Sequence, residues 1–131
     1  MTWFKGAVAV GSTILTYIFG GWDISLIVLA GFLVIDFITG WLYAIKNKTL
    51  SSNIGFKGLA KKLVIILILI LAVLLDRLIN DSVWIFRTLV SYFYIANEGL
   101  SILENSAKLG VPIPEKIKDV LLQLKGKNED E

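Results

Sequence analysis

The stretch from Leu63 to Leu75 contains no polar side chain, and it constrains the fold more than any other part of the chain. Lys61 and Lys62 directly precede it, and Asp76 and Arg77 directly follow it. A bilayer core is about 30 Å thick, so a spanning helix needs roughly 20 mostly apolar residues. The run is slightly shorter, and its β-branched residues also fit a buried helix or strand. Because 56% of the chain is hydrophobic and its mean hydropathy is +0.74, whereas soluble domains are about half apolar, we predict a membrane helix.

Other long apolar segments lie on both sides of this run. The predicted helices cover about residues 3–22, 24–45, 59–79 and 83–103. We predict an all-α integral membrane protein with three to four transmembrane helices, in which residues 1–105 form the membrane domain. The last segment is rich in aromatic residues but carries Arg87, Asn97 and Glu98, so it either returns through the membrane or lies in its interface.

The chain becomes more polar after Glu104. Between Glu115 and Lys125, the apolar residues fall at helical spacing and the charged residues lie opposite them. The apolar positions are Ile117, Val120, Leu121 and Leu124. We therefore predict that residues 106–131 form a short amphipathic cytoplasmic helix, bound to a membrane surface or another subunit, followed by a disordered tail from residue 126.

A basic segment separates the second and third apolar segments. It carries five lysines and no acidic residue: Lys46, Lys48, Lys57, Lys61 and Lys62. Loops of this kind stay on the cytoplasmic side of a membrane. We predict a cytoplasmic loop from Lys46 to Lys62, with Ser51, Ser52 and Asn53 as candidate N-cap residues for the next helix. The C-terminus is expected on the same side.

A few charged residues fall inside or beside the apolar segments. Asp36 lies ten residues before Lys46, or about 15 Å along a helix, which places it near the membrane midplane. A carboxylate there is either a pore or assembly residue or a structural group bonded to a neighbouring helix. Because Asp76, Arg77 and Arg87 would lie at a depth similar to that of Asp36, we hypothesise that the four form one polar cluster.

The residues predict no catalytic chemistry. The chain has no Cys and no His, which removes thiolate chemistry, the usual general base and the commonest metal ligand. The segment from Gly55 to Lys62 lacks the spacing of a phosphate-binding loop. Glu98 and Glu104 have no evident acid–base partner. We expect no enzyme activity, cofactor, metal site or nucleic-acid partner.

Five motifs, in order, resemble the small phage holins of the toxin-secretion and phage-lysis type, found in prophages and clostridial toxin loci. They are D-F-I-T-G (Asp36 to Gly40), S-S-N-I-G-F-K-G-L-A-K-K (Ser51 to Lys62), L-D-R-L (Leu75 to Leu78), Y-I-A-N-E-G-L-S-I-L-E-N (Tyr94 to Asn105) and L-G-V-P-I-P-E (Leu109 to Glu115).

The resemblance implies a bacterial plasma-membrane protein that forms homo-oligomers and opens pores for an endolysin or a toxin. It also implies control of timing, often by an antiholin, and about three membrane passes. The positions that it singles out are Asp36, Gly40, Lys61, Lys62, Asn97, Glu98 and Glu104. Two alternatives stay open: a small channel or transporter subunit, and an antiholin-like interaction protein or membrane anchor.

Overall fold

The computed structural model describes residues 1–126, and this part of the chain forms five α-helices and no strand. The helices are α1 (Thr2–Phe19), α2 (Ile24–Lys46), α3 (Ser52–Ile79), α4 (Phe86–Lys108) and α5 (Glu115–Leu124). The prediction of an all-helical chain is thereby confirmed. The disorder predicted for the tail beyond residue 126 lies outside the described residues.

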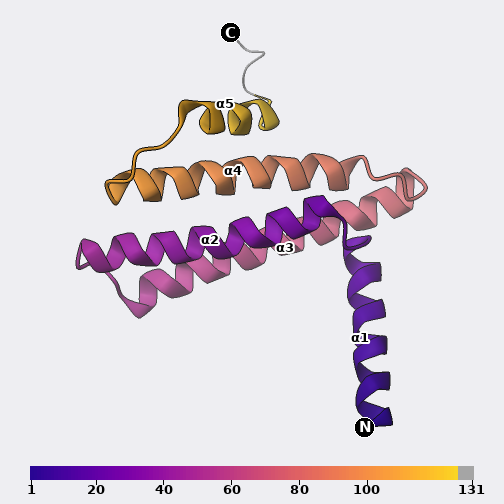
Figure 1. Ribbon diagram of the computed structural model, residues 1–131. Helices are drawn as coiled ribbons and strands as arrows, with labels where there is room; N and C mark the ends of the chain where they lie inside the picture. The colour runs from indigo at the N-terminus through magenta and orange to yellow at the C-terminus, as the bar shows by residue number, and fades with distance from the viewer. Residues whose placement is uncertain (127–131) are drawn as a thin grey trace.

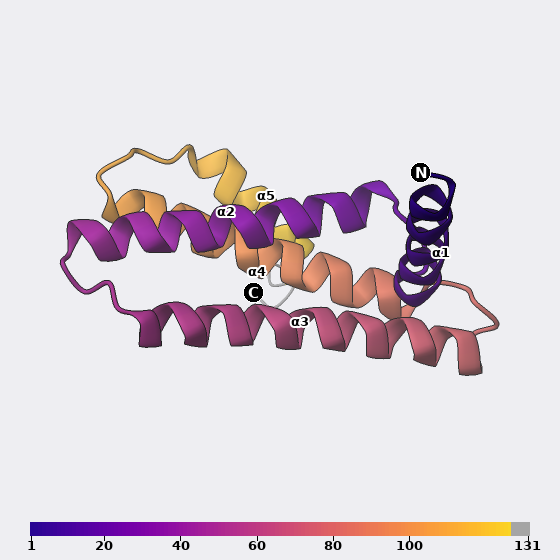
Figure 2. The same cartoon turned by 90° about the horizontal axis from the view of Figure 1, so that it is seen from below.

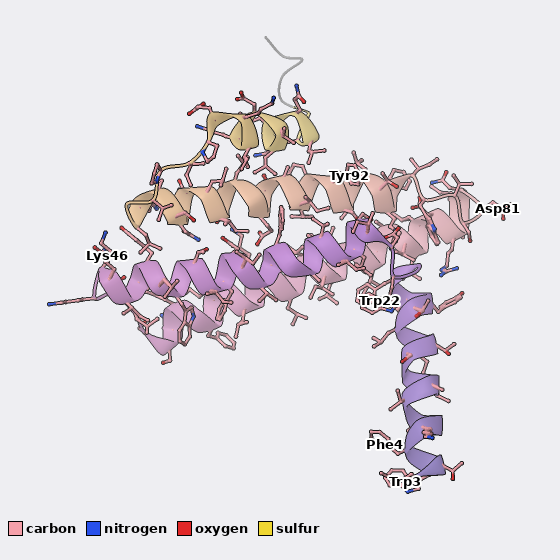
Figure 3. All side chains as sticks on the ribbon, viewed as in Figure 1. Trp3, Phe4, Trp22, Lys46, Asp81 and Tyr92 are labelled. Carbon is pink, nitrogen blue, oxygen red and sulfur yellow. The ribbon has the colours of Figure 1, made fainter. Side chains whose placement is uncertain are left out.

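Helices α2, α3 and α4 lie lengthwise beside one another and form a bundle (Figures 1 and 2). Helix α5 lies along the side of α4 that faces away from α2 and α3 (Figure 1). Helix α1 runs crosswise to the bundle, and the view in Figure 2 looks almost along it. Lys46 marks one end of the bundle and Asp81 the other (Figure 3). We call these the lysine end and the turn end.

The core of the bundle is built from aliphatic side chains spaced at helical intervals on three helices. Its buried members are Leu26, Leu29, Leu33, Ile65, Leu69 and Ile95. Leu26, Leu29 and Leu33 recur every three or four residues, so they line one face of α2. The opposite faces of α2 and α3 remain exposed and apolar, as expected for helices whose outer surface meets lipid rather than water.

Side chains cap the starts of α2 and α3, and the cap of α3 is one of the predicted residues. Asp23 accepts a hydrogen bond from the backbone N–H of Leu26 at 3.1 Å, and Ser51 accepts one from Ile54 at 3.2 Å. The start predicted for the third helix, near residue 59, is wrong, because the lysine-rich segment continues the helix back to Ser52. Lysine is a good helix former and its long side chain reaches solvent, so the charges do not break the helix.

The predicted cytoplasmic loop is consequently much shorter than residues 46–62. Lys57, Lys61 and Lys62 lie on the first turns of α3, and the connection between the helices covers only residues 47–51. Gly55 and Gly58 lie in α3 beside the rings of Trp41 and Phe37 from α2, at distances where an added Cβ would make ordinary van der Waals contact. The lysines therefore belong to the lysine end of the bundle rather than to a separate loop.

Among the described helices, α2 and α3 alone are long and apolar enough to cross a membrane by length and composition. The predicted segments 3–22 and 83–103 do form helices, α1 and α4, but neither meets the same criterion. Helix α1 carries Lys5 and several hydroxyl groups, and α4 carries charged residues along its length. Composition alone thus supports two membrane-crossing helices, fewer than the three to four predicted.

Candidate functional site: an ion triad within the bundle

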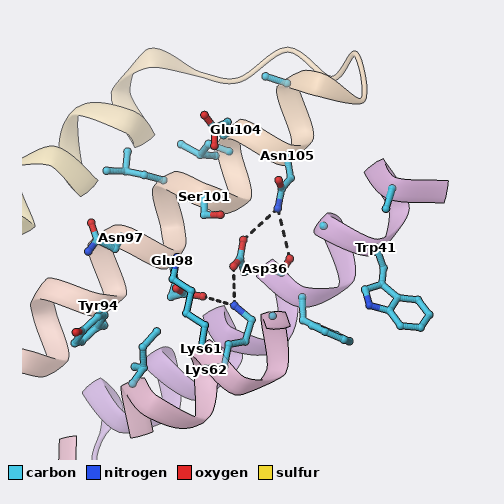
Figure 4. A pocket seen from close by; sticks show the side chains of 18 of the residues that line it. Asp36, Trp41, Lys61, Lys62, Tyr94, Asn97, Glu98, Ser101, Glu104 and Asn105 are labelled. Carbon is cyan, nitrogen blue, oxygen red and sulfur yellow. Dashed lines mark hydrogen bonds and ion pairs between the residues drawn. The ribbon is translucent and has the colours of Figure 1, made fainter. Parts of the chain in front are cut away.

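An ion triad joins α2, α3 and α4 near the middle of α2. The Nζ of Lys62 lies 2.7 Å from Oδ2 of Asp36 and 2.7 Å from Oε1 of Glu98, so one ammonium group donates to two carboxylates (Figure 4). The side chains of Lys62, Asp36 and Glu98 are 15%, 13% and 8% exposed. The triad therefore links three helices that share few other polar contacts, and it does so at one level along the bundle.

Asn105 extends this triad by about two turns of α4. Its Nδ2 donates to Oδ1 of Asp36 at 3.1 Å and to Oγ1 of Thr39 at 3.0 Å (Figure 4). The Thr39 hydroxyl in turn donates to the backbone carbonyl of Ile35 at 2.9 Å. Both oxygens of Asp36 are thus engaged, and its carboxylate is held in one orientation.

The triad borders an open hollow of about 1060 Å³ at the lysine-end half of the bundle. Helices α2, α3, α4 and α5 all contribute to its lining, and so do Lys61, Asn97 and Glu104 from the predicted set. Charged and apolar groups alternate around it, so water can reach the triad from one side. The hollow makes this polar site accessible within an otherwise apolar bundle.

The triad contains two carboxylates and only one ammonium group, so it carries excess negative charge when all three groups are ionised. A buried charge without a matching partner is costly, because the attraction within the site does not offset its lost hydration. Residues 1–126 contain no group of three or more His, Cys, Asp or Glu that could hold a metal ion. Because the triad has one more carboxylate than it has ammonium groups, water that enters the hollow stabilises the triad by hydrating this excess charge.

The hypothesis of one cluster formed by Asp36, Asp76, Arg77 and Arg87 is wrong. Asp36 pairs with Lys62, while the other three residues lie at the turn end. The two groups separate because the lysine block is part of α3, which brings Lys62 alongside Asp36. Because the sequence predicts a loop up to Lys62, it does not predict the ion pair between Lys62 and Asp36.

Asp76 holds the turn between α3 and α4. It is fully buried, and its carboxylate accepts hydrogen bonds from the backbone N–H groups of Phe86 and Arg87 at 2.9 and 2.8 Å and from the side chain of Asn80 at 2.8 Å. Helix α4 has no side-chain cap of its own at Ile85. Asp76 therefore supplies, from the end of α3, the carboxylate that the start of α4 requires.

Arg87 joins the same junction to the end of α1. It lies 2.7 Å from Oδ2 of Asp23 and also donates to the backbone carbonyls of Phe19 at 2.6 Å and Gly21 at 3.0 Å. The hydrogen bonds from Arg87 lower the pKa of Asp23 to about 2. Although Arg87 is buried, its charge is matched by one carboxylate and by carbonyl dipoles.

Arg77 contacts the last turn of α1 from the other side. Its Nη2 donates to the carbonyl of Tyr17 at 2.7 Å, and its Cζ lies 3.9 Å from the centre of the Tyr17 ring and 5.3 Å from that of Trp84. Two arginines from α3 and α4 therefore bind backbone carbonyl groups at the end of α1.

The remaining predicted residues lie around the lysine end. A Cβ on Gly40 would lie 3.7 Å from Nδ2 of Asn105, an ordinary van der Waals distance, so Gly40 lies at the contact between α2 and α4 without being required for it. Lys46 donates to the carbonyl of Lys108 at the end of α4, at 3.4 Å. Lys48, Lys57, Lys61 and Glu104 are exposed, and Asn97 is half-buried at the hollow.

Sequence reasoning missed Asn105, Thr39 and Asp23 as partners and assigned Lys62 to a loop. One signal was present, because Glu98 and Asn105 are seven residues apart and so share a face of α4. The spacing of Asp36 and Thr39, three residues apart, gives the matching face of α2. The pairing between helices depends on packing, which periodicity within one helix does not determine.

Helix α5 packs onto α4 through one close contact. A Cβ on Gly99 would lie 2.8 and 2.9 Å from the two Cδ atoms of Leu121, and 3.0 Å from the ring of Phe32 in α2. Leu121 is buried, whereas Ile117, Val120 and Leu124 of the predicted apolar stripe remain partly exposed. Gly99 therefore allows both α5 and α2 to pack closely against α4.

Comparisons with known proteins agree with one another. Residues 13–126 match the family described as the Bacteriophage holin family. The chain is 55% identical to an uncharacterized 14.9 kDa protein in the nagH 3′ region of Clostridium perfringens, over 93% of this chain and 92% of that protein. It is 41% identical to a probable holin of Bacillus phage phi105, over 73% and 70% of the two chains. No solved structure matches significantly.

Proposed function

Because the chain belongs to the bacteriophage holin family, we propose that it acts as a holin in the plasma membrane of a bacterium. In this proposal it forms homo-oligomers and opens lesions through which an endolysin or a toxin crosses. The activity is physical rather than enzymatic. It requires helices that insert in lipid, a face on which copies associate, and polar groups that tolerate water once a lesion opens.

The observation that carries the proposal is a charged helix beside the middle of an apolar bundle. Leu121 of α5 contacts Gly99 of α4, next to Glu98 of the ion triad. Ten residues separate Asp36 from Lys46, so this depth is about 15 Å inside the bundle. The charged residues of α5, which include Lys116 and Asp119, are exposed there and cannot face hydrocarbon without a high cost.

This cost is avoided if α2 and α3 face lipid while α4 and α5 face water. The outer surfaces of α2 and α3 present large apolar side chains: Ile27, Val34, Ile38, Leu63, Leu67, Leu71 and Leu74. Helix α4 would then cross as a third helix, shielded from lipid by α2 and α3 and wetted on its other side. The lysine end would lie on the cytoplasmic side, and α5 would lie along the wet side of α4.

A mechanism follows from the excess negative charge of the triad. In the resting protein, Lys62 pairs with both carboxylates and Asn105 donates a hydrogen bond to Asp36, but one negative charge has no cation of its own. When copies associate with α4 and α5 facing a common centre, water fills the hollow beside Glu98. Hydration then replaces part of these contacts, which stabilises the wet assembly relative to the monomer in lipid.

Induced expression with a cytoplasmic endolysin that lacks an export signal tests this function. We expect culture turbidity to fall abruptly after a delay when both proteins are made, and growth to stop without lysis when this chain is made alone. Ion leakage without release of the endolysin would instead support a small channel. Delay of lysis caused by another holin would support an antiholin.

A variant within the triad tests the mechanism separately. Asp36→Leu removes one of the two carboxylates, so at matched protein levels the onset of lysis should shift. Lys57→Met, which alters an exposed lysine of α3 outside the lining of the hollow, serves as the control and should leave the onset unchanged. If Asp36→Leu lyses cells at the unaltered time, the triad has no part in lesion opening.

A further inference from the structure

Helix α1 stands apart from the bundle in both direction and contacts. It runs crosswise to α2, α3 and α4 from the turn end (Figures 1 and 2), and none of its residues is buried by any described part of the chain. We propose that α1 lies flat in the extracytoplasmic headgroup region of the bilayer, with its partner the lipid surface itself. The inference rests on the proposed orientation of the bundle, with the turn end outside.

The residues of α1 divide into two arcs when they are placed at 100° intervals. The wide arc is apolar and includes Trp3, Ala7, Val10, Ile14 and Ile18. The opposite arc carries Lys5, the one charged residue, and four hydroxyl side chains: Thr2, Ser12, Thr13 and Thr16. A helix with one broad apolar face, one polar face and terminal aromatic residues is typical of a segment that lies in a membrane interface.

The apolar arc points to the side where lipid would be. Helix α1 and the bundle meet at a corner, and the labelled side chains of Trp3, Phe4 and Trp22 lie on the side of α1 from which the bundle extends (Figure 3). If the bundle crosses the membrane, this inner side of the corner is filled by acyl chains and headgroups. Trp3 and Trp22 are 76% and 52% exposed, so their rings are free to meet lipid.

The corner is fixed by specific contacts rather than by a loose linker. Arg87 and Arg77 bind the last carbonyl groups of α1, as described above. Gly20 ends the helix with φ of +81°, and a Cβ there would lie 3.0 Å from Nε of Arg87 and 3.1 Å from the ring of Trp84. A residue other than glycine at position 20 would meet both a strained backbone and these side chains.

The polar arc of α1 and Arg77 together line an open groove of about 460 Å³. Ser12, Thr13 and Thr16 contribute to it. A guanidinium group and hydroxyl groups at the headgroup level suit contact with lipid phosphates. The apolar arc and the polar arc thus indicate the same orientation of α1, with its apolar face toward the acyl chains and its polar face toward the headgroups.

This placement changes the topology of the chain. A spanning α1, as the sequence predicts, would put Met1 and the lysine end on the same side of the membrane. An interfacial α1 puts Met1 outside, because α1 and the turn end then share the outer surface. The three crossing helices would be α2, α3 and α4, and α1 would anchor the corner that Arg77 and Arg87 hold together.

Single cysteines introduced in the full-length chain test the placement, since the natural sequence has no cysteine. The sites on the polar arc are Lys5, Ser12 and Thr16, and those on the apolar arc are Ala7 and Ile14. Each variant is expressed in cells and treated, before the onset of lysis, with a maleimide that does not cross membranes. Asp81→Cys and Lys57→Cys, at the turn end and the lysine end, report the orientation of the bundle.

We expect all three polar-arc sites to react from outside several-fold faster than the two apolar-arc sites, which should react only after detergent is added. Asp81→Cys should react in intact cells and Lys57→Cys should not. A gradient from one end of α1 to the other would mean that α1 spans the membrane, and equal reaction of both arcs would mean that it leaves the lipid. Either result overturns the placement of α1 but leaves the proposed orientation of the bundle intact. If Lys57→Cys reacts in intact cells and Asp81→Cys does not, the proposed orientation is overturned as well.

Discussion

The turn end and the ion triad use charged residues in opposite ways. At the turn end, Asp76 binds two backbone N–H groups, and Arg77 and Arg87 bind backbone carbonyls of α1. In the triad, by contrast, Lys62 meets two carboxylates through side chains alone. Charges at the turn end therefore fix the path of the chain, while those in the triad join helices that could separate without unfolding.

The difference suggests which charged residues are structural and which can take part in opening a lesion. A carboxylate that replaces a missing helix cap cannot be released without losing the turn that it holds. A side-chain contact beside a hollow can be replaced by water at lower cost, because the helices keep their own backbone hydrogen bonds. We therefore assign Asp76 and Arg87 to the scaffold and propose Asp36 and Glu98 for the function.

The largest effect is expected for Asp76→Ala. The substitution leaves the N–H groups of Phe86 and Arg87 without their acceptor inside a buried turn, which should cost about 2–4 kcal/mol in the free energy of unfolding. Helix content measured by circular dichroism during denaturation in detergent would detect this loss. Asp81→Asn, in the same turn but exposed, is the matched control, because asparagine tolerates the positive φ of 51° at this position. Equal stability of the two variants would contradict the capping role of Asp76.

Next in size is the effect of removing the shared cation. Lys62→Met leaves Asp36 and Glu98 facing each other within the bundle and should destabilise it by about 3 kcal/mol. Adding Asp36→Asn and Glu98→Gln should restore most of this loss, because no charge then remains without a partner. Denaturation of the single, double and triple variants measures the coupling. If the losses simply add, the three side chains do not act as one unit.

How far the sequence predicts this fold depends on the kind of signal that a segment carries. The apolar run from Leu63 to Leu75 lies within α3, and Asp23 and Ser51 cap α2 and α3, because these signals act within a few residues. The direction of α1 could not be predicted, since it depends on Arg77 and Arg87, which follow in the chain by 58 or more residues and bind the carbonyls at its end.

The candidate site shows the same limit. Asp36 and Glu98 stood out in the sequence because each is a charge in an apolar segment, and the structure brings them to one lysine. The family resemblance singles out Lys62 as well, but the sequence does not predict its pairing with these carboxylates, because its lysine-rich stretch has a pattern that favours a loop. Only the packing of α3 against α4 distinguishes Lys62 from its exposed neighbour Lys61.

A smaller effect is expected from filling the space between α4 and α5. Gly99→Val places methyl groups where Leu121 and Phe32 now lie, so α5 should leave α4 while the bundle remains folded. Limited proteolysis near Lys118 would then speed up several-fold. Gly11→Val is the control, since a Cβ at Gly11 meets no atom within 4 Å. Unchanged proteolysis of the Gly99 variant would mean that α5 is held by other contacts.

The smallest effect is expected from the ion pair between Asp23 and Arg87, because Asp23 is 52% exposed to solvent. The pKa of Asp23 falls from its ordinary 3.8 to about 2 in the fold. A lowered pKa means that the pair stabilises the corner fully above about pH 4, and that this stabilisation is lost as the pH falls through about 2. Spin labels at Lys5 and Thr88 should therefore show a broader distribution of distances at pH 2 than at pH 6. Asp23→Asn keeps a good N-cap for α2 but lacks the titration, so its distances should not change over this range. A broadening of equal size in that variant would mean that another group holds the corner, and that the turn end depends less on this charge than its geometry indicates.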